Sequence, residues 1–541
     1  MLSEENKVID KVEKILVSCP YNEKLYQEVL QELNPIVIRT AQDEEYRNIL
    51  ANSYSIWKQL KTSLENCTLE KIIELCNEEH LYWYTRTIRG LIILMRNLSA
   101  NNQDIPRELS LQNSVVELFV KIVSLKLKYD DIETSTFIAI SSFLHNVTKK
   151  SVVFDRSILK SLMIFLQYPL EHPEKKHDLL FPYLLYFVNL ITNEDFLYYF
   201  FRQEQCTKIL YNFFILEMIK NHSTLSHYLK NISKEKNVGS SIEVGEKELT
   251  AIDMALVRLF SILACNESFC GYFEKLKDND IPKTIDILHV MQLVITSSDR
   301  WDKFQLTTIM MWCYNIFEKL ANDVTTYFDR DEEDEAKAGP IYQQLYSILD
   351  ILVSLSKFQH VLEFLNSYGF LSKLVPLLKL LQDNLIRVNF TKDISEKITK
   401  VKTTDSVGNE ILENKKLLKR IDYQTSTIKS TNFPEIKSFI IELLANLSYK
   451  NKNNQDKIRE LHGLEIVLSN CVIDDNDPFI KEKSIVCIRF LLEGNPDNQR
   501  IVAQLEAKGA VKDKDLEEAG YEVKVSKEGE IKLTSKEKKE E

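Results

Sequence analysis

The sequence predicts an all-α protein built from stacked helical repeats, and three observations support this fold class. The pair Asn454-Gln455 recurs as Asn498-Gln499 after 44 residues (498 minus 454), inside the ~40–47 residue period of armadillo and HEAT arrays. Glycine and proline number only 12 each in 541 residues, which disfavours the tight turns of β-rich folds. Apolar residues recur at steps of three and four over most of the chain. We therefore expect an armadillo- or HEAT-like helical solenoid.

Three segments show the helical pattern clearly. The apolar residues between Leu81 and Leu98 fall on one helix face, and those between Ile436 and Leu447 do the same. Asp477-Pro478 predicts the start of a third helix, because Asp caps helices and Pro suits their first position. That helix also carries apolar residues off its main face, such as Ile485. Helices of this kind are typical of a stacked array, in which each one packs between two neighbours.

Polar segments divide the chain into four predicted parts. These are N-terminal armadillo-like repeats over 1–390 with polar loops near 231–250 and 329–340, a polar linker or long loop over 391–431, a C-terminal repeat pair over 432–511, and a charged tail over 512–541. In the tail, apolar and polar residues alternate from Tyr521 to Leu533. This alternation favours a small β-hairpin.

Composition and charge exclude several classes of function. The formal net charge is −11 and no sustained basic run occurs, which disfavours nucleic acid as a partner because counterion release needs clustered Lys and Arg. No apolar stretch reaches the ~20 residues that cross a bilayer, so we expect no membrane insertion. The N-terminus is charged where a signal peptide is apolar. We therefore expect a cytoplasmic protein whose partners are other proteins, and the sequence is compatible with self-association.

The sequence lacks the motifs of common enzymes and metal sites. It contains no glycine-rich phosphate loop, no Gly-x-Ser-x-Gly elbow and no His-Glu-x-x-His, and its nine cysteines form no Cys-x-x-Cys. His172 and His177 are five residues apart, as are Cys265 and Cys270, a poor spacing for one metal on a helix face. We expect no catalytic residue, no cofactor and no metal, and hence a protein that is not an enzyme.

An asparagine recurs near the predicted helix ends, often with Ser or Thr two positions later, at Asn97, Asn146, Asn189, Asn266, Asn315 and Asn446. The intervals fit multiples of a repeat of forty-odd residues. Three interpretations are open. N-glycosylation would need a secretory signal, whereas an Asn in the left-handed conformation would end a helix. An Asn ladder that binds the main chain of a peptide is the third interpretation, similar to armadillo carriers such as importin-α.

Six polar residues are therefore candidates for contact with a protein partner: Arg96, Asn97, Asn146, Asn446, Arg489 and Asn495. Arg96 and Arg489 hold corresponding places before a predicted helix end, where a guanidinium suits a partner's carboxylate. Helix caps and ordinary ion pairs are the alternative roles of these residues.

The C-terminal block resembles the C-terminal domain of the ataxin-10 family. The resemblance is densest over about 435–511 and rests on Asn446-Leu-Ser448, Asn454-Gln-Asp456, Gly463-Leu464, Asp474-Asp-Asn-Asp-Pro-Phe-Ile480 and Leu491-Leu-Glu-Gly-Asn-Pro-Asp-Asn-Gln499. Phe490 departs from it, since relatives tend to have an Asn there. The stretch Leu94–Gln103 resembles the N-terminal region of the family, whereas 150–430 shows no resemblance. The chain is identified as a fungal member, of the group whose budding-yeast protein carries the name copper transport protein.

This resemblance implies a cytoplasmic armadillo-like scaffold without catalytic residues. In animals the family is associated with cytokinesis, cell survival and the binding of signalling proteins. Our leading hypothesis is a non-enzymatic scaffold that regulates cytokinesis. The alternative is a carrier or adaptor that holds an extended peptide of a cargo in the groove of the solenoid. An enzyme, or an indirect role in copper homeostasis, ranks below both, because no ligand set for copper is found.

Overall fold

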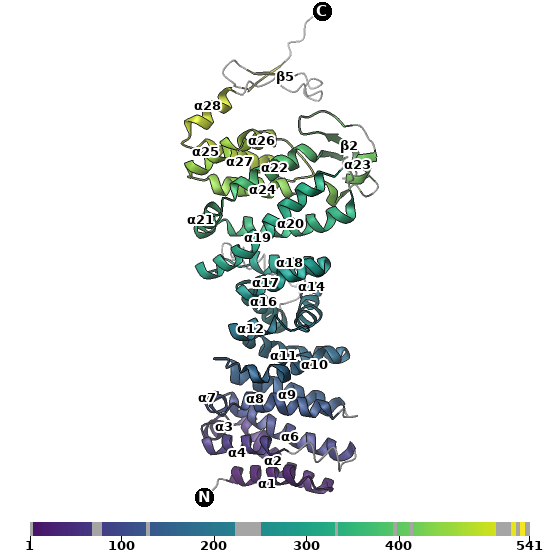
Figure 1. Cartoon of the computed structure of the whole chain (residues 1–541), viewed down its shortest axis with the longest axis vertical. Coiled ribbons are helices and arrows are strands. Elements are labelled where there is room, and N and C mark those ends of the chain that lie inside the picture. The colour runs from purple at the N-terminus through teal and green to yellow at the C-terminus, as the bar shows by residue number, and fades with distance from the viewer. Residues whose placement is uncertain are drawn as a thin grey trace, which may run out of the picture. The chain divides into compact units, whose positions relative to one another are not determined.

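The computed structural model confirms the expected all-α solenoid (Figure 1). It describes residues 4–67, 78–125, 130–221, 225, 250–330, 334–392, 398–411, 415–423, 425, 427–504, 521–525 and 531–535. The chain forms two compact units, Met1–Trp301 and Asp302–Glu541. The main boundary predicted from the sequence lies elsewhere, at 391–431, because the polar composition of that segment suggested a linker.

In the described part of unit 1, all the regular elements are helices. Its elements are α1 (Glu4–Ser18), α2 (Glu23–Gln42), α3 (Glu44–Ala51), α4 (Tyr54–Glu65), α6 (Glu78–Ser99), α7 (Asp104–Glu108), α8 (Leu111–Ser124), α9 (Asp130–Thr148), η1 (Arg156–Ile158), α10 (Leu159–Glu171), η2 (Pro173–Lys175), α11 (Lys176–Leu190), α12 (Glu194–Phe200), α13 (Cys206–Lys208), the π-helix η3 (Ile209–Ile215), α14 (Leu216–Lys220), α16 (Ala251–Ala264), α17 (Glu267–Asn279) and α18 (Ile281–Thr296). Side chains cap many of the starts: Asn22, Asp43 and Asn193 each accept a bond from a main-chain N–H of the first turn.

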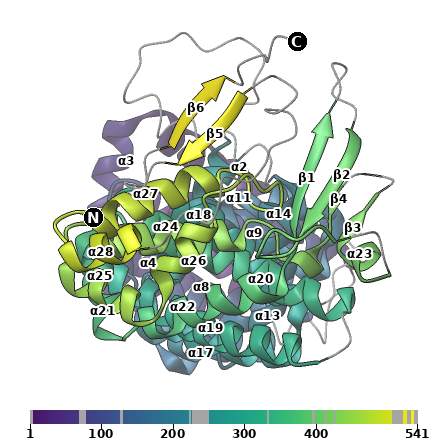
Figure 2. The ribbon, with the colours of Figure 1, turned by 90° about the horizontal axis from the view of Figure 1, so that it is seen from above.

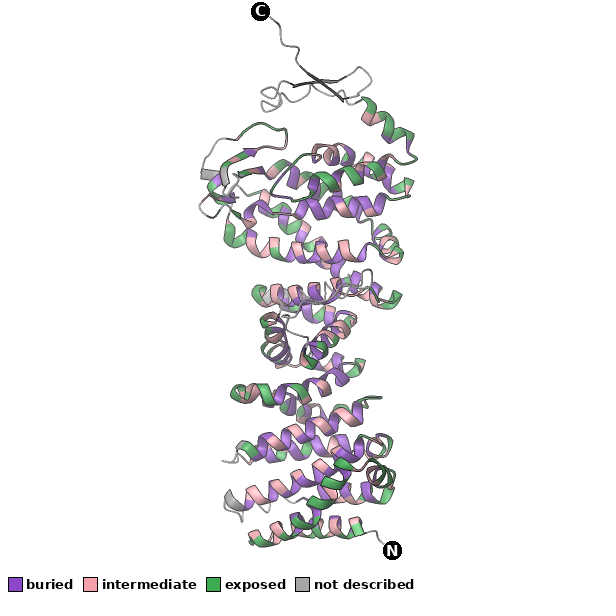
Figure 3. Ribbon diagram, turned by 180° about the vertical axis from the view of Figure 1, so that it is seen from behind, coloured by how far each residue is buried: buried purple, intermediate pink, exposed green. Residues whose placement is uncertain are grey.

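Four long helices of unit 1 pack in series: α2 against α6, α6 against α9, and α9 against α11. We call these four the ladder helices. Their facing sides are apolar and fully buried, for example at Leu91, Ile92 and Ile140. Beside them, rings from α8, α9 and α10 stack, with the Phe137 and Phe165 centroids 4.8 Å apart. The core of the unit therefore runs between successive layers of helices (Figure 3).

Unit 2 combines helices with short strands. Its elements are α19 (Lys303–Phe328), α20 (Glu335–Leu355), α21 (Gln359–Ser367), α22 (Leu371–Asn384), β1 (Arg387–Lys392), β2 (Ile398–Thr404), α23 (Lys415–Arg420), β3 (Ile421–Asp422), β4 (Thr427–Ile428), η4 (Ser430–Asn432), α24 (Ile436–Ser448), α25 (Lys452–Glu460), α26 (Gly463–Ser469), α27 (Ile480–Leu492), α28 (Pro496–Gln504), β5 (Tyr521–Val525) and β6 (Ile531–Ser535). The strands form three two-stranded antiparallel sheets.

The segment 391–431, which the sequence predicts as a linker or loop, contains regular structure where it is described. β1 pairs with β2 in register from Arg387 opposite Thr404, and β3 pairs with β4 (Figure 2). Val388, Leu417 and Ile421 are buried together in a small apolar cluster of their own. This small apolar cluster, separate from the core between the helices, therefore stabilises the segment.

The structure describes only part of the two predicted polar loops. Residues 231–249 lie outside the described residues, and Thr250 begins α16 with a capping box to Asp253. Within 329–340, α20 begins at Glu335 after the cap Asp334. The hairpin expected in the tail is present as β5 and β6, with Val523 opposite Leu533.

The repeat pair of unit 2 has matching helix starts. Glu435 precedes α24 and Phe479 precedes α27, each following a proline, 44 residues apart (479 minus 435). Both adopt the left-handed conformation, with φ of 67° and 63°. α24 packs against both α20 and α27. It is therefore buried on nearly all sides, as expected for a helix inside a stack.

The Asn-Gln pairs that indicated the repeat period close the ends of these two helices. Nδ2 of Asn454 donates to the main-chain oxygen seven residues earlier at 2.7 Å, and Nδ2 of Asn498 does the same at 2.8 Å. Nε2 of Gln455 and of Gln499 likewise donate to oxygens seven residues earlier, at 3.2 and 2.8 Å. The last carbonyls of a helix have no partner inside it. The period therefore reflects a repeated cap at the helix C-terminus.

Among the described helices, none is by itself long and apolar enough to cross a membrane. α16 passes the same criteria of length and composition only together with Glu267–Leu276 of α17, and that pair is bent by 91°.

Candidate protein-binding site

The predicted asparagines connect successive ladder helices. Nδ2 of Asn146 on α9 donates to the main-chain oxygen of Arg96 on α6 at 3.0 Å and to Oγ of Ser99 at 3.1 Å. The Ser99 hydroxyl in turn donates to the same Arg96 oxygen at 2.8 Å. One amide thus satisfies a carbonyl and a hydroxyl of the preceding helix near its end, where carbonyls lack partners in their own helix.

Asn189 on α11 repeats this arrangement one layer further. Its Nδ2 donates to the main-chain oxygen of His145 at 3.0 Å and to Oγ1 of Thr148 at 3.1 Å, both on α9. The hydroxyl of Thr148 donates to the oxygen of Leu144 at 2.7 Å. The Asn-x-Ser/Thr pattern therefore connects each helix to both of its neighbours. The Asn donates a hydrogen bond to the preceding helix, and the Ser or Thr hydroxyl accepts one from the Asn of the following helix.

Asn97 on α6 makes the first of these connections. Its Nδ2 donates to the main-chain oxygen of Val37 on α2 at 3.0 Å and to Oγ1 of Thr40 at 3.2 Å. Its Oδ1 accepts from Nε and Nη2 of Arg96 at 3.3 and 3.0 Å. Three candidates from the sequence, Arg96, Asn97 and Asn146, are thus brought together at the end of α6.

The interpretation of these residues as left-handed helix terminators is wrong. None of the six asparagines has a positive φ, although all six are described. Asn97, Asn146 and Asn189 lie inside their helices, and Asn266 is the cap that begins α17. The Nδ2 atoms of Asn97, Asn146 and Asn189 donate to partners 41 to 60 residues away along the chain, so the local pattern could not reveal them.

The remaining candidates lie in unit 2. Nδ2 of Asn446 donates to Oγ of Ser356, the residue that caps the end of α20, at 2.7 Å, a contact between neighbouring helices like those of unit 1. Asn495 is fully buried, and its Nδ2 donates to Oδ1 of Asp456 at 2.9 Å. Arg489 is exposed on α27. Of these three, Arg489 is exposed, Asn446 is half-buried and Asn495 is buried.

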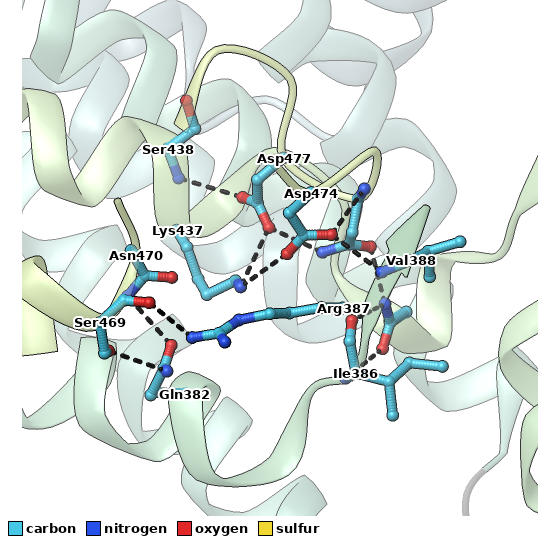
Figure 4. Close-up of polar contacts among 12 residues, drawn as sticks. Gln382, Ile386, Arg387, Val388, Lys437, Ser438, Ser469, Asn470, Asp474 and Asp477 are labelled. Carbon is cyan, nitrogen blue, oxygen red and sulfur yellow. Dashed lines mark hydrogen bonds and ion pairs between the residues drawn. The ribbon is translucent and has the colours of Figure 1, made fainter. Parts of the chain in front are cut away.

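Three charged side chains meet in the interior of unit 2 (Figure 4). Nζ of Lys437 lies 3.2 Å from Oδ2 of Asp474 and 3.4 Å from Oδ2 of Asp477, and all three side chains are at most 2% exposed. Burial raises the pKa of Asp477 above its usual value, although Lys437 opposes this effect. We call Lys437, Asp474 and Asp477 the buried ion cluster.

The contacts of this cluster are structural. Oδ1 of Asp474 accepts from the main-chain N–H of Val388 on β1 at 3.0 Å, and Oδ1 of Asp477 accepts from that of Ser438 on α24 at 3.1 Å. The cluster therefore joins the loop before α27 to both β1 and α24. With every charged atom enclosed, it offers no surface to a substrate.

A row of arginines on α6 is the stronger candidate for binding. Arg86, Arg89 and Arg96 follow at steps of three and seven, which places them on one side of the helix. All three are half-buried. We call these three residues the arginine face. Of these three arginines, only Arg96 was predicted as a contact residue, although the spacing of the other two is visible in the sequence.

The contacts of the arginine face are with neutral groups. Nη1 of Arg89 donates to Oγ of Ser135 on α9 at 2.6 Å. Nη1 of Arg86 donates to Oη of Tyr82 at 3.1 Å, and its guanidinium lies 5.0 Å from the ring centre of Trp83. Among the side chains that the structure describes, no carboxylate lies within 4.0 Å of these three guanidinium groups. Burial and the nearby charge of Arg86 lower the pKa of Arg89.

Such an arrangement favours an anionic ligand. A guanidinium carries five N–H donors in a plane and binds a carboxylate or phosphate with two parallel hydrogen bonds. Like charges at neighbouring positions repel one another, and a partner's anion would relieve that repulsion. For a metal, by contrast, no group of three His, Cys, Asp or Glu side chains occurs among the described residues.

Comparison with known proteins supplies the family. A family model described as the spinocerebellar ataxia type 10 protein domain matches residues 436–534. The ataxin-10 homolog of Candida glabrata is 41% identical over 536 residues, which cover 99% of each chain. That of Saccharomyces cerevisiae is 37% identical over 547 residues, covering 99% of this chain and 96% of its own. This chain belongs to the ataxin-10 family.

Within the ataxin-10 family, similarity to the human protein is confined to a small part of the chain. Human ataxin-10 is 45% identical over 87 residues, which are 16% of this chain and 18% of that protein. The two yeast alignments instead extend over nearly the whole chain, including 150–430, where residue patterns alone showed no resemblance. The buried ion cluster lies inside the range of the family model, whereas the arginine face lies outside it.

Proposed function

We propose that this ataxin-10 family member is a non-enzymatic scaffold that binds other proteins, and that the arginine face of α6 contacts an acidic segment of a partner. One observation carries the proposal: three half-buried arginines on one helix face have only neutral contacts among the described side chains. Charged side chains are rarely buried without a counter-charge. A partner's carboxylates would provide it.

The charge of the whole chain favours protein over nucleic acid as the ligand. Three arginines neutralise few phosphates, and the net charge of −11 would repel a long polyanion. A short acidic segment is repelled less than a long polyanion, because most of its negative charges lie close to the positive potential of the arginine face. By the same reasoning, the contact weakens as the salt concentration rises.

A carrier that holds a peptide main chain through the Asn ladder has less support. The Nδ2 atoms of Asn97, Asn146 and Asn189 already donate to the preceding helix. Binding a peptide with the same amides would break these bonds and remove a donor from each of the carbonyls that they reach. In the proposed scaffold, the guanidinium groups bind the partner instead, and the hydrogen bonds between the ladder helices stay in place.

The cellular role is proposed from the family resemblance. We infer a cytoplasmic protein that takes part in the regulation of cytokinesis through its protein partners. Depletion of the protein should delay septation, and re-expression of a variant with Arg86→Gln and Arg89→Gln should fail to restore it. Restoration by that variant would separate the division phenotype from the arginine face.

The binding proposal is tested by crosslinking mass spectrometry of the chain purified from its own cells. We expect crosslinks from α6 and α9 to acidic segments of a partner, and their loss in the Arg86→Gln, Arg89→Gln variant. A variant with Lys7→Gln and Arg300→Gln removes the same charge at exposed sites of unit 1 and should keep them. Equal recovery of the partner by both variants, with both folded by circular dichroism, would refute the proposal.

A further inference from the structure

Unit 2 contains a helix face that is covered in one repeat and bare in the next. Ile441 on α24 is 0% exposed, whereas Ile485, 44 residues later (485 minus 441) on α27, is 52% exposed. α24 has long helices on two sides, α20 and α27. The described neighbours of α27 are α24, α26 and α28. The side of α27 that corresponds to the covered side of α24 therefore has no described layer upon it.

The same contrast holds at equivalent positions along both helices. On α24 the residues Lys437, Ser438, Ile441, Leu444, Ala445 and Ser448 are all buried. Their equivalents 44 residues later are exposed or half-exposed: Lys481, Glu482, Ile485, Ile488, Arg489 and Leu492. We call these six residues of α27 the end face. It has an apolar centre with charged residues around it, the composition of an interface rather than of a freely exposed helix.

The chain supplies a complementary element after α28. Strand β5 pairs with β6 so that Val523 lies opposite Leu533 and Val525 opposite Ile531. Polar residues alternate with these apolar positions in both strands, so the apolar positions fall on one face of the hairpin. An isolated two-stranded hairpin is at best marginally stable in water. Like the end face, it needs an apolar surface to pack against.

We propose that the β5–β6 hairpin packs on the end face of α27 and caps the helical array. The 16 residues from 505 to 520 span up to about 50 Å when extended, which is ample to reach α27 from the end of α28. The matched family domain, residues 436–534, includes both α27 and the hairpin. A helical array needs a terminal element that shields the apolar face of its last repeat. This inference concerns the C-terminal end of unit 2 and is independent of the arginine face.

The hairpin is favoured over a second copy of the chain as the occupant. It is tethered to the end face, which gives it an effective concentration of the order of millimolar. A second copy would present an identical end face, on which Lys481 and Arg489 outnumber Glu482, so that the two faces carry net charge of the same sign. Such like charges would oppose the association.

The test is hydrogen–deuterium exchange of the purified full-length chain. We expect the amides of β5 and β6 to exchange at least tenfold more slowly than a free peptide of residues 505–541. In Ile485→Asp this protection should be lost, while the amides of α24 stay protected. The control Val407→Asp adds the same charge at a residue 83% exposed in the turn after β2 and should leave the hairpin protected. The reciprocal variant Val523→Asp should raise exchange on α27.

Two results would overturn the inference. One is exchange of the hairpin amides in the unaltered chain at the rate of the free peptide. The other is protection that disappears on dilution together with a dimer seen by light scattering, since the occupant would then be a second copy.

Discussion

Asn146 on α9 and Arg96 on α6, fifty residues apart in sequence, are joined by a hydrogen bond of 3.0 Å from the side-chain amide to the main-chain oxygen. Asn97 and Asn189 make equivalent bonds one layer before and one layer after. Each ladder helix is therefore fixed in register against the next by a side-chain amide that bonds a main-chain oxygen across a mainly apolar interface. This register in turn places Ser135 of α9 beside Arg89 of the arginine face.

Replacement of Asn146 by Ala should lower the free energy of unfolding by about 1–3 kcal/mol, because the Arg96 carbonyl and the Ser99 hydroxyl lose their shared donor. Urea denaturation followed by circular dichroism measures the change. Asn212 is exposed, so Asn212→Ala should alter stability by less than about 0.5 kcal/mol. A loss of equal size in both variants would show that the ladder bonds contribute nothing specific.

Two glutamines at equivalent places should differ in their effect. Nε2 of Gln455 is buried and also donates to the main-chain oxygen of Phe490 at 2.8 Å, whereas the bond of Gln499 to Leu492 is exposed. We expect Gln455→Ala to cost about 1–3 kcal/mol and Gln499→Ala less than about 1 kcal/mol. Thermal unfolding of the two variants side by side provides the comparison. The prediction fails if Gln499→Ala is the more destabilising change.

Two cations should also respond differently to removal. Lys437→Met leaves Asp474 and Asp477 buried without their counter-charge, which should cost about 3–5 kcal/mol. Arg89→Gln removes a half-buried guanidinium whose described contact is one serine hydroxyl, and should cost less than about 1 kcal/mol. Urea denaturation of both variants at pH 7 measures the difference. Similar losses would mean that Arg89 has a structural counter-charge after all.

The raised pKa of Asp477 predicts how stability depends on pH. Burial is the main cause of the shift, so the folded state holds the proton at pH values where the unfolded chain, with its usual pKa of 3.8, has released it. Stability from this group is therefore greatest at low pH and falls as pH rises above 3.8. Asp477→Asn lacks this titration. The free energy of unfolding of the Asp477→Asn variant, relative to that of the unaltered chain, should rise between pH 4 and pH 7. A constant difference across that range would contradict the raised pKa of Asp477.

Much of the fold could be predicted from local patterns. The recurrence of Asn454-Gln455 at Asn498-Gln499 exists because each pair caps the helix seven residues before it, a short-range interaction that leaves a visible period in the sequence. The start of α27 after Asp477-Pro478 was visible in the same way, although the structure begins the helix at Ile480. The alternation in the tail correctly predicted β5 and β6.

The remaining features depend on partners that are distant in sequence. The segment 391–431 looked like a linker because its residues are polar, yet β1 is held by Asp474 and by Asp475, whose Oδ2 accepts from the N–H of Phe390 at 2.6 Å. The candidate Asn495 looked available to a partner, but Asp456 and Gln455 occupy its amide. Contacts over 39 to 86 residues leave no local pattern.

The bond between Val388 and Asp474 spans 86 residues and has a consequence for cooperativity. It ties the first strand of unit 2 to the loop before α27, so the helices between them cannot open one at a time without breaking it. In the described part of unit 1, the main contacts of the ladder helices run from one layer to the next, which allows fraying to spread inward from α1. We therefore expect unit 2 to melt as one block, and unit 1 to lose its order gradually from its N-terminal edge.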